Sequence, residues 1–311
     1  MDSPRETVPF TAWPELTLSE WDDTREALHR WTQVVGKLRL TLEPMMNQWW
    51  QVPLYISARG LTTSLMPYGR ELGLEVEFDF IHHLLVLRTT DGREQHVELR
   101  PRSVADFYRA VMEALAALAM PIQIWPVPSE LPDATPLDRD EEHRSYDPGA
   151  AHRFWIALVA AHRVMRRFRS GFQGKASPVH FFWGAADLAT TRFSGRPAPL
   201  HPGGVPNCPD WVQQLAYSQE VSSCGFWPGG SEEGSFYSYC YPEPSGFRGW
   251  PVEAPGRFDE TLGEFILPYR EVRLSSDREE MVLRFFQQTY EAAAQLLQWD
   301  RASLEADGPP R

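Results

Sequence analysis

The densest group of chemically versatile side chains lies between residues 172 and 187. Lys175, Ser177, His180 and Asp187 fall within 13 positions of one another. On a strand, His180 and Phe182 would share one face, because successive side chains point to opposite sides. A histidine on such a face can titrate near neutral pH and act as a general acid or base. The equally favoured alternative is a core histidine that bonds a backbone carbonyl.

Lysine is scarce in this chain. Only Lys37 and Lys175 are lysines among the 30 basic residues, and each directly follows a glycine. An amine, unlike a guanidinium, can lose its proton, form a Schiff base or place a compact charge. We therefore predict that Lys175 is a catalytic amine or an anion anchor. Lys37 lies near a predicted helix end, where a basic side chain can cap the last carbonyl groups. The alternative for both lysines is that they have no function and remain by chance.

A second group of polar and aromatic residues occupies positions 217–241. In strand geometry Glu220 and Ser222 share a face, which would place a carboxylate beside hydroxyls. Tyr237 and Tyr239 likewise share a face, and a surface rich in tyrosine and tryptophan suits a pocket for a small organic ligand. Ordinary sheet packing is the alternative explanation for the tyrosines.

These segments together predict one site for a small polar or anionic substrate. In it His180 and Glu220 act as acid and base, and Lys175 is the anchor. The remaining predicted site residues bind the substrate; they are Arg192 and Arg59 as anion anchors, Trp183, Trp227 and Tyr239 as walls, and Ser177, Asp187, Ser222 and His201 as polar contacts. The hypothesis requires His180, Lys175 and Glu220 to converge within about 10 Å in the fold, the scale of one ligand site; their lying on separate faces would contradict it.

No metal or cofactor is identified by the sequence. Cys208, Cys224 and Cys240 are evenly spaced 16 residues apart, which matches no zinc pattern. His180 and His201 with Glu220 would make a two-histidine, one-carboxylate set, but they lack the close sequence spacing typical of such sites. We therefore predict no metal site.

The elements that position these residues form two similar α+β halves, each an antiparallel sheet with flanking helices. Apolar periodicity predicts a helix over 19–41, capped by Ser19, and others capped by Ser103 and Asp147, with a last helix beginning at Ser276. Alternating or apolar runs predict strands at 52–57, 72–80, 83–89, 95–100, 122–125, 179–183, 188–193, 217–223, 236–241 and 264–268.

The domain prediction places one half at 1–125 and the other at 148–311. Residues 126–147 contain four prolines and a cluster of acids without apolar periodicity, which is typical of a linker or a surface loop.

The two predicted halves also align with each other. Residues 52–63 align with 179–190 at an offset of 127, and 97–100 align with 272–275 at an offset of 175. The second half therefore holds 48 extra residues in loops rich in proline and glycine, where function tends to lie. An internal duplication is the interpretation we favour; chance similarity of amphipathic patterns is the alternative.

Composition limits the classes of function. The 311 residues are 42% hydrophobic and 13% aromatic, so the chain is a folded globular protein. A net charge of −12 opposes binding to nucleic acid. The longest nearly apolar run, 114–122, is too short to cross a membrane, and the first residues do not resemble a signal peptide. Three cysteines, an odd number, suit reduced thiols in the cytoplasm.

Several blocks of the sequence resemble a family of bacterial proteins known only as a domain of unknown function. They include GKASPVHFFWG at 174–184 and EVSSCGFWPGG at 220–230, and the resemblance covers nearly the whole chain. It implies a cytoplasmic bacterial protein of a single architecture and assigns no reaction or catalytic residue. This chain reads NQWW at 47–50 where the family leads us to expect NHWW, which weakens any case for a histidine at position 48.

These observations predict a protein with a small-molecule site, and the first hypothesis is an enzyme acting on a small polar or anionic substrate. The alternatives are a non-catalytic protein that binds a small ligand and a module that binds another protein; whether the chain is an enzyme stays open, as does its oligomeric state. A partner-binding module would expose an apolar patch in place of a pocket.

Overall fold

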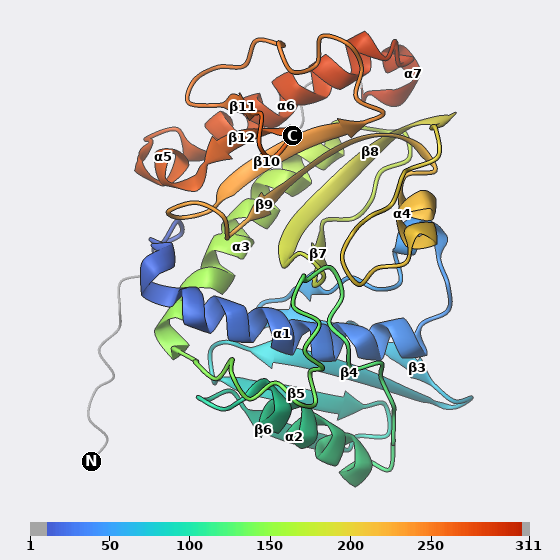
Figure 1. Cartoon of the computed structure of the whole chain (residues 1–311), viewed down its shortest axis with the longest axis vertical. Coiled ribbons are helices and arrows are strands. Elements are labelled where there is room, and N and C mark those ends of the chain that lie inside the picture. Colours follow the sequence, from blue (N-terminus) through green and yellow to red (C-terminus); the bar gives the residue numbers. More distant parts are fainter. Residues whose placement is uncertain (1–10, 307–311) are drawn as a thin grey trace.

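The computed structural model describes residues 11–306 and confirms the α+β class, with two antiparallel sheets and flanking helices (Figure 1). The first sheet has the strand order β1-β2-β4-β5-β6, and β3 pairs with the first residues of β4. Its strands are β1 Tyr55–Ile56, β2 Gly60–Thr62, β3 Met66–Tyr68, β4 Leu72–Asp79, β5 Leu84–Thr89 and β6 Glu94–Glu98. Before it come α1 Leu18–Leu42 and the short 3₁₀ helix η1 Asn47–Trp49, and after it comes α2 Val104–Ala117.

The second sheet has the strand order β11-β12-β10-β9-β8-β7. Its strands are β7 His180–Phe182, β8 Asp187–Pro197, β9 Gln219–Trp227, β10 Ser235–Tyr241, β11 Arg257–Asp259 and β12 Glu264–Pro268. The helices of this half are α3 Pro148–Ser170, α4 Asp210–Ala216, α5 Tyr269–Leu274, α6 Arg278–Leu296 and α7 Arg301–Leu304. Arg192 on β8 stacks on Phe168 of α3 and Tyr290 of α6, so these two helices cover one face of the sheet.

Helix α1 crosses the molecule between the two sheets in Figure 1. Every residue from Ala27 to Arg39 is buried, so the polar face that an amphipathic pattern would leave in water is covered as well. Backbone carbonyl groups of neighbouring segments contact the polar side chains of this face. The Nε2 atom of His29 lies 2.8 Å from the carbonyl oxygen of Gly184, and the Nε atom of Arg39 donates a hydrogen bond to the carbonyl oxygen of Gln51. Buried polar atoms need such partners.

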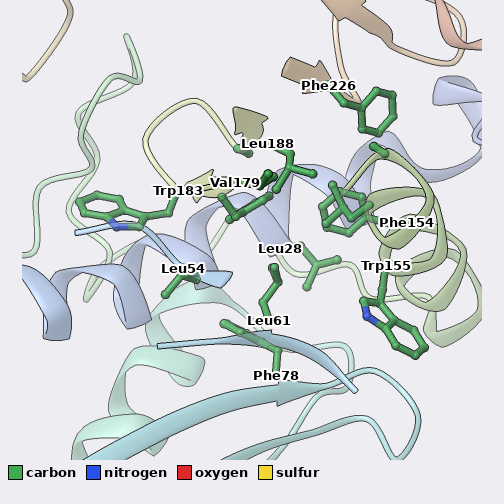
Figure 2. Close-up of a cluster of buried hydrophobic side chains, with 14 of the residues drawn as sticks. Leu28, Leu54, Leu61, Phe78, Phe154, Trp155, Val179, Trp183, Leu188 and Phe226 are labelled. Atoms are coloured by element: carbon green, nitrogen blue, oxygen red, sulfur yellow. The ribbon is translucent and has the colours of Figure 1, made fainter. Parts of the chain in front are cut away.

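One continuous core joins the two halves (Figure 2). Leu61 and Phe78 come from the first sheet, Leu188 and Phe226 from the second, and Leu28 of α1 belongs to the same cluster. The sheets also meet through a two-way bridge in which the amide of Leu54 donates to Phe181 O and the amide of Phe181 donates to Leu54 O.

Residues 126–147, predicted as a linker or surface loop, pack on α1. The side-chain amide of Gln33 exchanges two hydrogen bonds with the backbone of Ser129, at 2.9 and 2.7 Å. Arg30 pairs with the buried Asp140 at 3.2 Å. Leu137 is fully buried. The segment thus supplies partners for polar atoms of α1, and the domain boundaries drawn on either side of it stay a prediction.

Helix capping follows the sequence at two of the four predicted positions. Ser103 accepts the amide of Asp106, and Asp147 accepts the amide of Ala150, as predicted. The caps predicted at Ser19 and Ser276 are wrong: α1 begins after Thr17 and α6 after Asp277, and neither has a side-chain cap.

Two other sequence predictions are wrong as well. Residues 122–125 form no strand, because Ile122 and Ile124 alternate into the core without a neighbouring strand to pair with. Val272 lies in α5, where it and Tyr269 are buried one helical turn apart, so 272–275 does not correspond to the β6 region.

Candidate functional site

A pocket of about 670 Å³ lies over the face of the second sheet that α3 and α6 leave free. This volume falls within the usual range for small-molecule sites, roughly 300–1,000 Å³. Alternate residues of the strands form its base, as the two-residue period of a strand requires. They are Phe182 of β7; Asp187, Ala189, Thr191 and Phe193 of β8; Val221, Ser223 and Trp227 of β9; Tyr237 and Tyr239 of β10; and Glu264 of β12.

The opposite wall comes from segments distant in sequence. Trp49 of η1 packs on Trp211 of α4, with ring centroids 4.9 Å apart. Ser129 and Glu130 of the proline-rich segment also line the pocket, as do several residues between 205 and 217. The long connection between β8 and β9 therefore forms part of this wall.

Asp187 is the central acidic group of the pocket. It is 8% exposed, and its Oδ2 accepts a hydrogen bond from the hydroxyl of Tyr237. Burial raises the pKa of Asp187 to about 6, although the hydrogen bond from Tyr237 acts in the opposite direction. Tyr237 reaches across Gly225, where a Cβ would overlap the phenol ring. The glycine at 225 therefore allows this contact.

Glu130 adds a second carboxyl group from the other wall. Burial, with a further contribution from the charge of Asp187, raises the pKa of Glu130 to about 7. Its backbone is left-handed, with φ of 64°, and its amide donates to the carbonyl of Pro206 at 2.9 Å. Its carboxylate lies against Gly184, where an added Cβ would overlap it. A non-glycine residue in this conformation is strained, and such residues concentrate at functional sites.

Glu264 is the third carboxyl group. It precedes Phe265, which pairs with Ser238, so Glu264 lies beside Tyr239 at the far side of the sheet face. Burial, together with the charges of Asp187 and Asp259, raises the pKa of Glu264 to about 7. Neither Glu264 nor Glu130 has a side-chain hydrogen bond or an ion pair with another residue of the described part of the chain.

Hydroxyl groups connect the strands between these acids. Thr191, Ser223 and Tyr239 stand side by side on β8, β9 and β10. The Thr191 and Ser223 hydroxyls are 2.9 Å apart, and the Tyr239 and Tyr217 hydroxyls are 2.7 Å apart. The rings of Tyr237 and Tyr239 are stacked with centroids 6.1 Å apart. The base of the pocket is therefore polar along one row and aromatic beside it.

No lysine, arginine or histidine is among the residues that line the pocket in the part of the chain between 11 and 306. The two lysines lie behind its aromatic walls. Lys37 is 2% exposed, donates to Ser129 Oγ at 3.1 Å and lies 5.5 Å from the Trp183 ring centroid. Burial lowers the pKa of Lys37 to about 8.

Lys175 is held on the other side of the pocket wall. Its Nζ donates to the side-chain oxygens of Gln48 and Gln219 at 2.7 and 2.8 Å. It also lies 4.6 Å from the ring centroid of Phe193, a pocket residue. Burial lowers the pKa of Lys175.

The residues predicted as catalytic have other surroundings. His180 is fully buried among the rings of Trp50, Tyr55 and Phe182, and neither ring nitrogen has a hydrogen-bond partner among the described residues. Glu220 pairs with Arg196 at 2.7 Å. Neither of them lines the pocket, and Lys175 does not either.

The residues predicted to bind substrate divide into two groups. Asp187, Trp183, Trp227 and Tyr239 line the pocket. The other five lie outside its lining. Arg192 of β8 and Ser222 of β9 lie on the helix-covered face of the sheet. Ser177 forms hydrogen bonds with the backbone of Pro178 and Thr191, His201 stacks on Tyr217, and Arg59 pairs with Asp79 in the first half.

Sequence reasoning missed Glu130 and Glu264 as well as Trp49 and Trp211. The sequence indicated a site role for Glu264 only weakly, because this residue is the first of a predicted strand. Its place beside Tyr239 depends on strand pairing that the sequence does not reveal. The sequence indicated no site role for Glu130, because its segment has no periodicity and is positioned by hydrogen bonds to α1 and to Pro206.

The fold and the pocket define an α+β protein with an acidic, aromatic-lined cavity on its second sheet. Residues 13–306 match a protein family described as "Family of unknown function (DUF5996)", and the chain belongs to that family. Neither the curated proteins nor the solved structures contain a match to it.

Two further features of the described residues bear on the kind of site. Within 11–306, no group of three or more histidine, cysteine, aspartate or glutamate side chains is placed to hold a metal ion. None of the helices assigned there combines the length and hydrophobicity needed to span a bilayer.

Proposed function

We propose that the protein binds a small organic molecule in the pocket on the second sheet. The observation that carries this proposal is a cavity of about 670 Å³ lined by ten aromatic side chains, in which the carboxyl groups of Glu130 and Glu264 have no partner among residues 11–306. Unpartnered polar groups in a cavity cost free energy unless a ligand or water satisfies them. The buried Nε1 of Trp49, another lining residue, also lacks a partner among the described residues.

A variant that fills the pocket tests this proposal. Thr191 lies at the base of the pocket and is partly exposed there, so Thr191→Trp should occupy the cavity, whereas Thr191→Val keeps the shape and removes only a hydroxyl. Both variants are checked for folding by circular dichroism. A fragment library is then screened by saturation-transfer NMR. We expect hits that bind the wild type and Thr191→Val but not Thr191→Trp; hits that bind all three equally would contradict a ligand site here.

Acid–base catalysis in the same pocket is a second candidate, favoured by the hydrogen bond between Asp187 and Tyr237. A carboxyl group with a pKa of about 6 can donate and accept a proton near neutral pH. Incubating a metabolite extract with wild type and with Asp187→Asn, followed by mass spectrometry, tests this candidate. Mass changes that need the Asp187 carboxyl would support an enzyme, and ligand binding without any turnover would favour a binding protein.

The sequence-based roles of His180, Glu220 and Lys175 stay predictions. In the present proposal those groups support the structure around the pocket, and the carboxyl groups that line it take part in ligand binding. The prediction of an anionic substrate gives way to a neutral polar or cationic one, because the pocket lining contains three acids and no base.

The two halves of the chain are, in this proposal, copies of one unit. Support comes from the corresponding strand orders, with β1, β2, β4, β5 and β6 matching β7, β8, β9, β10 and β12. Further support comes from the bridge between Leu54 and Phe181, which joins residues that the 127-residue offset equates. The units are 1–125 and 148–311, and the segment 126–147 between them carries Glu130 to the pocket.

The place of action proposed is the bacterial cytoplasm, without a nucleic-acid partner. This part rests on the sequence: the odd number of cysteines, the resemblance described above and the net charge of −12.

A further inference from the structure

The charges that line the pocket are of one sign. Glu130, Asp187 and Glu264 are its ionisable side chains apart from tyrosines and Cys208, and no basic side chain of the described residues is part of the lining. Asp187 accepts a hydrogen bond from the hydroxyl of Tyr237, which carries no positive charge. In a concave pocket, carboxylates without cationic partners set up a negative potential that attracts a positive ligand.

The lysines nearest the pocket are already engaged elsewhere. Lys37 bonds Ser129 from behind Trp183, and Lys175 bonds Gln48 and Gln219 from behind Phe193. Neither lysine forms an ion pair with a carboxylate of the described chain. The acids of the pocket are therefore not neutralised by the protein itself.

The aromatic walls suit the same kind of ligand. Tyr237 and Tyr239 present stacked rings beside Asp187 and Glu264, and Trp49 and Trp211 form a tilted pair on the other wall. The faces of such rings attract cations, most strongly when water is excluded. The acids are not grouped as ligands of one metal ion, and the cavity is far larger than an ion needs.

We infer, on the basis of the proposed binding function, that the ligand is an organic cation, an amine or a quaternary ammonium attached to an apolar body. The charged nitrogen contacts a carboxylate of the pocket lining, which holds Asp187, Glu130 and Glu264, and the apolar body contacts the tryptophans of the wall. An anionic ligand would meet three acids and no counter-charge.

Protonation supports the inference and adds a measurable consequence. Burial raises the pKa values of Asp187, Glu130 and Glu264, so the empty pocket holds protons near neutral pH. A bound cation favours the ionised carboxylates and displaces those protons. Affinity for a cation should therefore increase as the pH rises from about 5 to about 8, the range around these pKa values.

Three probes of the same shape test the charge preference. Naphthylmethylamine, naphthalenemethanol and naphthoate share one ring system and carry a positive, a neutral and a negative group. Their affinities for the wild type and for Thr191→Trp are measured by isothermal titration calorimetry. We expect the amine to bind the wild type roughly tenfold or more tightly than the alcohol, as a combined cation–π and charge interaction predicts, and the acid to bind most weakly.

The outcomes separate this inference from the proposed function. Equal binding of the three probes, or a preference for naphthoate, with loss in Thr191→Trp, would overturn the inference and leave the binding function standing. Absence of any binding that Thr191→Trp removes would count against both.

Isosteric variants locate the charge that the amine recognises. Glu130→Gln and Glu264→Gln keep the size of each side chain and should weaken amine binding about fivefold or more while leaving the alcohol nearly unaffected. Glu98→Gln, which changes an exposed residue of β6, is the matched control and should change neither. An amine affinity that is the same in all four proteins, or that does not increase with pH, would overturn the inference.

Discussion

Replacing the buried histidine of β7 should make the protein more resistant to acid. His180 is fully buried among aromatic rings, and no described residue accepts or donates a hydrogen bond to its nitrogens. His180→Leu has a similar volume and removes both polar atoms. Because an unsatisfied buried polar group costs about 1–3 kcal/mol, the variant should be more stable by an amount of that order near neutral pH.

The pH dependence gives a sharper magnitude. Burial, with smaller contributions from the charges of Arg39 and Arg169, lowers the pKa of His180 to about 3 from an ordinary value of 6.5. The unfolded chain therefore takes up a proton below about pH 6.5 that the folded protein does not, and stability is lost as the pH falls from there toward 3. At about pH 5 the difference of 1.5 pH units corresponds to a loss of about 2 kcal/mol.

Urea unfolding at about pH 7.5 and pH 5 measures this effect. The drop in the free energy of unfolding between the two pH values should be about 2 kcal/mol smaller in His180→Leu than in the wild type. Other histidines, such as the buried His29, contribute to both proteins and cancel in the comparison. Equal drops in the two proteins would show that His180 is not held neutral by burial, and the reasoning would be refuted.

Three further predictions follow from buried contacts. Gly36→Ala should lower the free energy of unfolding by about 1–3 kcal/mol, because the new methyl group would overlap the Trp183 ring. Urea unfolding measures this loss of stability, and an unchanged midpoint would show that the ring can move away. Lys37→Met should raise the free energy of unfolding near neutral pH. Burial lowers the pKa of Lys37 to about 8, so the folded protein holds this proton less tightly than the unfolded chain does. Thermal unfolding should show that the gain in stability shrinks as the pH rises past about 8, and a gain independent of pH would argue against this cause. Tyr237→Phe removes a hydrogen bond that lowers the pKa of Asp187, so the pH midpoint for binding of naphthylmethylamine should move upward. Calorimetric titration measures this midpoint, and an unchanged value would contradict the role given to the hydrogen bond.

Local patterns predicted the elements whose environment is local. The alternation of apolar and acidic residues identified β4, and Ser103 and Asp147 identified two helix starts because their side chains bond amides three residues along the chain. Asp187, Trp183 and Tyr239 were predicted to lie in a site and do line the pocket; Tyr239 belongs to the predicted tyrosine face of β10, whereas Trp183 follows the end of β7 at Phe182.

The rest of the site depends on contacts that local patterns do not encode. Glu264 joins the sheet face of the pocket because β12 pairs with β10 as well as with β11, its neighbour in sequence order. Glu130 reaches the pocket through hydrogen bonds made by a segment without periodicity. His180 lies on the predicted face, but Trp50 and Tyr55 from the first half cover it. Such long-range packing decides which polar residues meet a ligand.

Native mass spectrometry of the protein purified from its own host tests the central claim most directly, with Thr191→Trp purified in parallel. We expect the wild type to retain a small organic molecule, whose mass and fragmentation identify a cationic nitrogen, and the variant to lack it. A wild type that carries no ligand, or a molecule retained equally by Thr191→Trp, would contradict the claim that this pocket is the functional site.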